Sequence, residues 1–65
     1  MMLNVGDLIA LKTNPAKRYI ITRKWTNYFK DSMFDLSSEL YPEITFPEFE
    51  KYVIVDFVKV EDGTL

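Results

Sequence analysis

The 65-residue sequence predicts a single, mostly β domain over residues 1–65, in which five short strands curl into a small barrel. β-Branched and aromatic residues occur in short runs that are separated by proline and glycine. No segment keeps apolar residues at positions i, i+3, i+4 and i+7 over three turns, which argues against a long amphipathic helix. Hydrophobic residues make up 48% of the chain, a share too high for a disordered tail.

The first two strands are predicted over residues 8–12 and 19–25. Apolar residues fill the first run, and Asn14-Pro15 ends it because proline lacks a backbone donor and favours a turn. The second run, Tyr-Ile-Ile-Thr-Arg-Lys-Trp, is the strongest strand signal in the chain. Neither of its faces is uniformly polar, so we expect it to be covered at one end and exposed at the other.

Two shorter strands follow, over residues 33–37 and 44–46, and Pro47 marks the second as an edge or a strand end. Residues 52–60 allow two structures. They form either one long strand or a 3₁₀ turn over residues 52–55 followed by a fifth strand over residues 57–60. The side chains expected in the core are Leu8, Ile20, Trp25, Ile54 and Phe57.

Composition argues against most catalytic and metal chemistry. The chain has no cysteine and no histidine, so disulfides, thiolate or imidazole metal sites and Cys- or His-based catalysis are excluded. No glycine-rich phosphate loop occurs, and the carboxylate pairs Asp31/Asp35 and Glu48/Glu50 would need a pocket of roughly 300 Å³ that a small barrel hardly provides. We expect no catalytic residue, no metal and no cofactor.

The ends and apolar runs of the chain indicate a cytoplasmic protein. The longest uninterrupted apolar run covers only residues 8–11, whereas a membrane helix needs about 20 such residues. The first residues carry no basic segment and no apolar stretch of the kind found in a signal peptide. We therefore expect no contact with a membrane.

Charge is distributed unevenly along the chain. Residues 1–30 contain six Lys or Arg and one acid, whereas residues 31–65 contain two lysines and nine acids. Either the two halves neutralise each other in the folded protein, or they form a basic and an acidic face that steer a partner.

Both ends of the chain resemble a known family. Residues 4–12, Asn-Val-Gly-Asp-Leu-Ile-Ala-Leu-Lys, resemble the opening of many small SH3-like barrels, in which a Gly-Asp pair precedes an apolar first strand. Residues 52–60 are similar to the usual end of these barrels, a short 3₁₀ turn and a fifth strand. The resemblance implies a five-stranded SH3-like barrel of the uncharacterised type found in bacteria and tailed phages, acting as a small accessory or host-modulating factor. The motif Ala-Leu-Tyr-Asp-Tyr of signalling SH3 domains is absent, so no proline-peptide groove is implied.

Aromatic residues in or beside the predicted loops are the first candidate site. They either close the barrel ends or form an anchor patch for another protein or a second copy of the chain, flanked by acids that set the charge of the partner. The predicted protein-binding residues are Tyr28, Phe29, Tyr41, Phe46, Glu48 and Phe49.

The basic and aromatic second strand is the alternative site. Nucleic-acid-binding proteins combine cations for phosphates with aromatic faces for bases, and Arg18, Arg23, Lys24 and Trp25 offer both. The net charge of −2 argues against this alternative. The sequence therefore predicts first a non-catalytic protein-binding module.

Overall fold

The computed structural model describes residues 3–61 and confirms the mostly β class. Five strands form one antiparallel sheet in the order β4-β3-β2-β1-β5, and one short helix precedes the last strand. The elements are β1 (Leu8–Leu11), β2 (Asn14–Thr26), β3 (Ser32–Ser38), β4 (Thr45–Phe49), α1 (Glu50–Asp56) and β5 (Phe57–Lys59).

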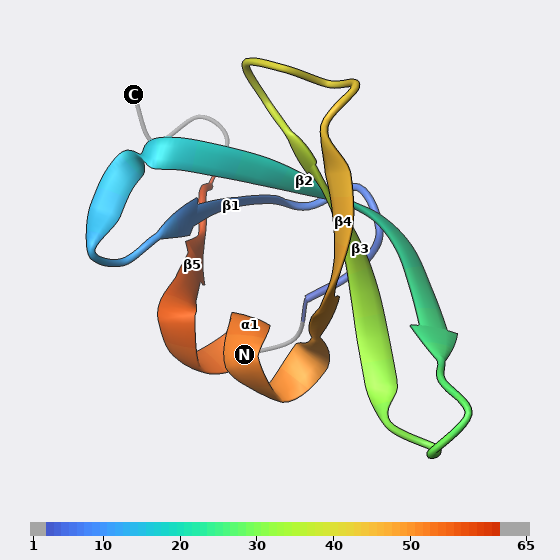
Figure 1. Cartoon of the computed structure of the whole chain (residues 1–65). Helices are drawn as coiled ribbons and strands as arrows, with labels where there is room; N and C mark the ends of the chain where they lie inside the picture. Colours follow the sequence, from blue (N-terminus) through green and yellow to red (C-terminus); the bar gives the residue numbers. More distant parts are fainter. Residues whose placement is uncertain (1–2, 62–65) are drawn as a thin grey trace.

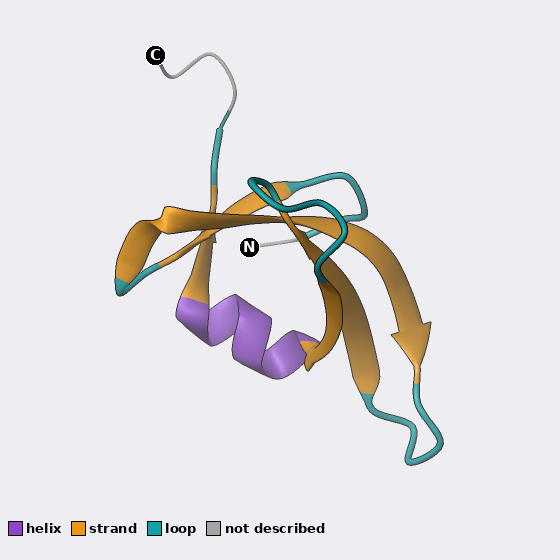
Figure 2. Cartoon of the chain, turned by 45° about the horizontal axis from the view of Figure 1, so that its top comes forward, coloured by secondary structure: helices purple, strands orange, loops and turns teal. Residues whose placement is uncertain are grey.

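The sheet is strongly curled, and α1 crosses its open side from the edge strand β4 to the edge strand β5 (Figures 1 and 2). The two edge strands do not pair with each other, so the sheet is not closed. The long strand β2 runs through the middle of the sheet and ends in the hairpin that projects away from the helix (Figure 1).

The core lies between the inner face of the sheet and α1. Its fully buried large side chains are Ile9, Ile21, Phe34, Leu36 and Val53, and Leu3 and Phe57 complete the cluster. Of the five side chains predicted to be buried, Phe57 is confirmed. Leu8 and Trp25 are mostly buried but lie outside the core cluster, so the prediction is confirmed for them in part. Ile20 and Ile54 are exposed, and the prediction is wrong for these two.

A bulge in β2 explains part of this error. The pairing of β2 with β3 shifts between Ile21 and Arg23, so Thr22 is an extra residue. Successive residues of a strand point to opposite faces, and one extra residue exchanges the two faces beyond it. Ile21 is therefore buried on the inner face, whereas Trp25 lies beyond the bulge on the outer face.

The segment after β4 is a seven-residue α-helix rather than the predicted 3₁₀ turn or continuous strand. Its sequence is rich in β-branched residues, which favour strands. Tertiary packing overrides this preference, because the helix places Val53 and Phe57, four residues apart, in the same core. Lys24 of β2 pairs with Glu50 at the first turn of α1 at 3.5 Å.

The prediction that Asn14-Pro15 forms the turn after the first strand is wrong, although β1 ends within one residue of the predicted position. A turn of only two residues follows β1, and β2 begins at Asn14, opposite Leu11. Proline is tolerated there because this end of β2 is exposed.

Both edge strands offer few free backbone donors. Ser38 N–H donates to Ile44 O, and every second residue of an antiparallel strand bonds to its partner strand in this way. The backbone groups of the intervening residues of β4 therefore point away from β3, and these residues are Thr45, Pro47 and Phe49. Pro47 has no N–H, and Phe49 N–H donates to Glu48 Oε1 at 3.1 Å. On the other edge, the outward N–H of Phe57 donates to Val53 O and ends α1.

Candidate functional site

The structure separates the six predicted protein-binding residues into three places. Tyr41 and Phe46 line one hollow, between β2, β4 and the loop from β3 to β4. Tyr28 and Phe29 form the tip of the β2–β3 hairpin. Glu48 and Phe49 are neighbours in β4 and point to its two opposite faces.

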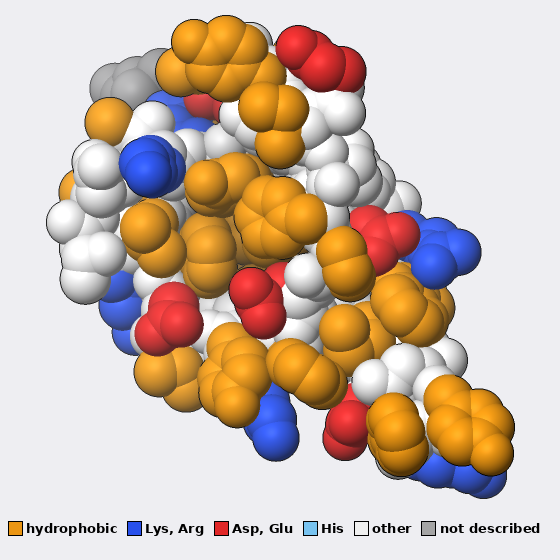
Figure 3. All heavy atoms as spheres, in the orientation of Figure 1, with side chains coloured by type: hydrophobic (Ala, Val, Ile, Leu, Met, Phe, Trp, Pro, Cys, Tyr) orange, Lys and Arg blue, Asp and Glu red, His pale blue; other side chains and the backbone are white. Residues whose placement is uncertain are grey.

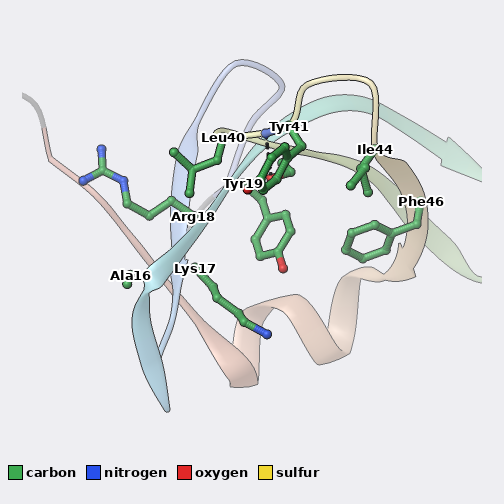
Figure 4. Close-up of a pocket in the computed structure, with 9 residues that line it drawn as sticks. Ala16, Lys17, Arg18, Tyr19, Leu40, Tyr41, Ile44 and Phe46 are labelled. Carbon is green, nitrogen blue, oxygen red and sulfur yellow. Dashed lines mark hydrogen bonds between the residues drawn. The ribbon is translucent and has the colours of Figure 1, made fainter.

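The hollow has a volume of about 280 Å³ and is mainly apolar. Tyr19 and Phe46 form its floor, and Leu40, Tyr41 and Ile44 stand around its rim (Figure 4). Figure 3 shows exposed apolar side chains gathered over this part of the molecule. Ala16, Lys17, Arg18 and Ser38 complete the wall.

Alternation along β2 fixes the floor. Lys17, Tyr19 and Ile21 follow one another on the inner face, from the exposed end of the strand to the core. The half-buried Tyr19 ring packs edge to face against Phe46, with 5.5 Å between the ring centroids, and against Phe57 at 5.8 Å. The floor is therefore an extension of the core.

Hydrogen bonds within the β3–β4 loop hold the rim. Ser37 Oγ donates to Pro42 O at 2.8 Å, Tyr41 N–H donates to Ser38 Oγ at 3.2 Å, and Ile44 N–H donates to Tyr41 O at 2.8 Å. The rim side chains of Leu40, Tyr41 and Ile44 nevertheless remain at least half exposed. The loop thus presents large apolar groups to solvent in an ordered arrangement.

The hairpin tip is the second exposed aromatic surface. The Tyr28 and Phe29 side chains are 92% and 78% exposed, and their rings pack edge to face at 5.4 Å. Asn27 orders the tip, because its Oδ1 accepts hydrogen bonds from Phe29 N–H and Asp31 N–H, both at 2.9 Å. In Figures 1 and 3 the tip lies at the lower right, away from the β3–β4 loop.

Phe49 and Glu48 both make contacts with other residues of the folded chain. Phe49 is half-buried, lies opposite Met33 in the ladder, and packs edge to face against Tyr52 at 5.5 Å. Glu48 accepts the Phe49 N–H. These contacts favour a structural role for Phe49 over the predicted role as a free anchor.

Ion pairs join the basic first half of the chain to the acidic second half. This agrees with the predicted alternative in which the two halves neutralise each other. Within residues 3–61, Arg18 pairs with Glu39 at 3.0 Å, Arg23 with Asp35 at 3.1 Å, and Lys24 with Glu50 at 3.5 Å. In the fourth pair the cation comes from the acidic half and the acid from the basic half: Lys59 pairs with Asp7 at 3.6 Å.

The same contacts occupy the four residues of the nucleic-acid alternative. Arg18, Arg23 and Lys24 are all ion-paired. The indole of Trp25 lies under the Arg23 guanidinium, 4.9 Å from it, and its Nε1–H donates to Asp35 Oδ1 at 2.8 Å. The three cations thus have carboxylate partners within the protein, and the face of the Trp25 ring is in contact with Arg23.

Sequence reasoning missed Tyr19, Leu40 and Ile44 as parts of the hollow. Tyr19 was assigned to a strand, and its position at the open end of the inner face depends on the register. Leu40 carries a signal that was available, because it is apolar and precedes Tyr41-Pro42 in a predicted loop, where polar residues are the norm. Ile44 was predicted as the first residue of the fourth strand, and its place at the rim depends on the fold of the loop.

Comparison with protein-family models, with curated proteins and with solved structures finds no match for the chain. Across residues 3–61, no helix has the length and apolar character needed to cross a membrane.

Proposed function

We propose that this protein is a non-catalytic protein-binding module whose site is the hollow under the β3–β4 loop. The observation that carries the proposal is the rim, where Leu40, Tyr41 and Ile44 stay exposed although their loop is tied down by hydrogen bonds. Exposed apolar groups around an ordered depression are typical of protein-interaction surfaces, where a few aromatic and aliphatic anchors supply most of the binding energy.

We further propose that the fold is an SH3-like barrel. Two observations support it: the strand order β4-β3-β2-β1-β5, and a short helix that crosses the open side immediately before the last strand. A role as a small phage-type accessory or host-modulating factor rests on the resemblance of the two chain ends alone.

The main test is a pull-down from a host lysate followed by affinity measurement with the partner it recovers. Tyr41→Ala should weaken that binding by about 2 kcal/mol, roughly thirtyfold, because it removes a rim anchor. The melting temperature should hardly change, because the Tyr41 side chain is more than half exposed.

Tyr28→Ala is the matched control, since it makes the same change on a still more exposed side chain at the hairpin tip. It should bind the partner as the wild type does. Equal losses in the two variants, or a loss only in Tyr28→Ala, would remove the hollow as the binding site.

Nucleic-acid binding is the weaker alternative, because its candidate cations are neutralised by carboxylates. We expect neither duplex DNA nor single-stranded RNA to bind below about 100 µM at physiological salt, the weak end of nonspecific binding. Fluorescence anisotropy with labelled oligonucleotides measures this directly. Micromolar binding that weakens steeply with salt and is lost in Arg23→Glu/Lys24→Glu would reverse the order of the two functions.

A further inference from the structure

The hollow is polar at one end only. Leu40, Tyr41 and Ile44 gather at the loop end, whereas the Lys17 ammonium group and the Tyr19 hydroxyl both lie on the opposite side, toward the helix ribbon (Figure 4). A ligand that fills the hollow from the loop end therefore meets two hydrogen-bond donors beyond the apolar floor.

These two donors are unused. Within the part of the chain that the structure describes, Lys17 has no ion pair and the Tyr19 hydroxyl has no hydrogen-bond partner. Arg18 is the other cation that lines the hollow, and it differs from Lys17 in its direction and in having an ion-pair partner. Its guanidinium group is directed away from the hollow in Figure 4, and its Nε lies 3.0 Å from Glu39 Oε1.

No acidic residue among residues 3–61 lines the hollow. Glu48 points to the same face of β4 as Phe46 but is not among the residues that line the hollow. One of its oxygens accepts the Phe49 N–H. The lining of the hollow thus carries one uncompensated positive charge, that of Lys17.

We infer that the hollow binds a segment of a protein partner in which an apolar side chain lies next to a carboxylate. The apolar side chain fills the space between the rim and the Tyr19 and Phe46 rings. The carboxylate accepts hydrogen bonds from Lys17 Nζ and from the Tyr19 hydroxyl, and a charged acceptor makes the stronger bond. The inference rests on the proposed function and adds to it the chemistry of the ligand.

Short blocked peptides test the inference on the intact protein. Acetylated and amidated Gly-Gly-Leu-Asp-Gly-Gly, its Leu-Lys and Leu-Asn counterparts, and a Ser-Asp counterpart are titrated into ¹⁵N-labelled protein while amide shifts are followed. We expect the Leu-Asp peptide to shift the amides of the hollow and to bind about two- to fivefold more tightly than the Leu-Lys peptide, the range of an exposed ion pair. Added salt should reduce this preference. The Ser-Asp peptide should bind more weakly than Leu-Asp because it lacks the apolar side chain.

Charge reversal gives the sharper result. Lys17→Glu should invert the preference, so that the Leu-Lys peptide binds more tightly than Leu-Asp. Lys12→Glu makes the same change in net charge at an exposed lysine outside the hollow and should leave the preference unchanged. Tyr19→Phe keeps the ring of the floor but removes the hydroxyl donor, and should reduce the preference for Leu-Asp.

Different results of these titrations would contradict the inference and the proposed function. Equal binding of the Leu-Asp and Leu-Lys peptides at the hollow, or tighter binding of Leu-Lys to the wild type, overturns the inference and leaves the proposed function standing. Absence of shifts at the hollow with every peptide up to millimolar concentration contradicts both. Shifts of the hollow amides with protein concentration alone identify a second copy as the occupant and overturn the acidic ligand.

Discussion

Phe34→Ala should leave the protein largely unfolded at 37 °C. Phe34 is completely buried at the centre of the core, between the sheet and α1. Truncating a buried phenylalanine to alanine costs about 3–5 kcal/mol, and the single core of a domain this small rarely supplies more than that. Thermal unfolding followed by circular dichroism, together with the dispersion of amide signals, measures the effect.

Phe29→Ala is the matched control because it makes the same change at the exposed hairpin tip. Its free energy of unfolding should lie within about 0.5 kcal/mol of the wild-type value. If Phe34→Ala melted cooperatively within a few degrees of the wild type, the core described above would be wrong.

Asp35→Ala should lower stability by about 2 kcal/mol. Asp35 accepts the Trp25 Nε1–H at 2.8 Å and pairs with Arg23 at 3.1 Å, and its side chain is only 21% exposed. Its loss leaves a half-buried indole donor without its partner, which costs about 1–3 kcal/mol. For a domain of this size the melting temperature should fall by about 8–16 °C.

Glu39→Ala is the comparison, since Glu39 has one partner, Arg18, and both side chains are more than a third exposed. Its cost should be between 0 and about 1 kcal/mol. Asp35→Asn keeps an acceptor for Trp25 but removes the charge, so it should fall between the wild type and Asp35→Ala. Equal stability of Asp35→Ala and Glu39→Ala would show that the Trp25 contact contributes nothing.

Local signals in the sequence are enough to locate four of the five strands, and one of the two structures left open for residues 52–60 places the fifth. Runs of β-branched and aromatic residues bounded by proline and turn residues place each strand within a few residues, apart from the start of β2. Pro47 also marks β4 correctly as an edge strand. These properties depend on residue type and near neighbours, so they can be read without knowledge of the fold.

Register and helix type depend on contacts between distant segments and could not be read in this way. Ile20 and Ile21 are adjacent and chemically identical, and only the pairing of Ile21 with Leu36 and its packing in the core decide which of the two is buried. The α1 segment prefers an extended chain by composition and becomes helical because Val53 and Phe57 complete the core.

Only part of the candidate site could be predicted, because the rest depends on contacts between distant segments. Tyr28 and Phe29 were correctly expected in a loop, and they are exposed. Tyr41 and Phe46 were both predicted, but their partner Tyr19 comes from a strand more than 20 residues earlier in the chain. Such a juxtaposition is a property of the curled sheet and not of any local pattern.

The few free donors on the two sheet edges restrict how this protein can associate with other chains. A partner strand, or a second copy, that extends the sheet needs a row of outward N–H groups. In β4 and β5 the outward positions are Thr45, Pro47, Phe49, Phe57 and Lys59, and of these five residues only Thr45 and Lys59 retain an unoccupied donor. Strand addition and its pathological form, the growth of cross-β fibrils, are therefore disfavoured on both sides. Recognition is left to side chains, which is the mode that we propose for the hollow.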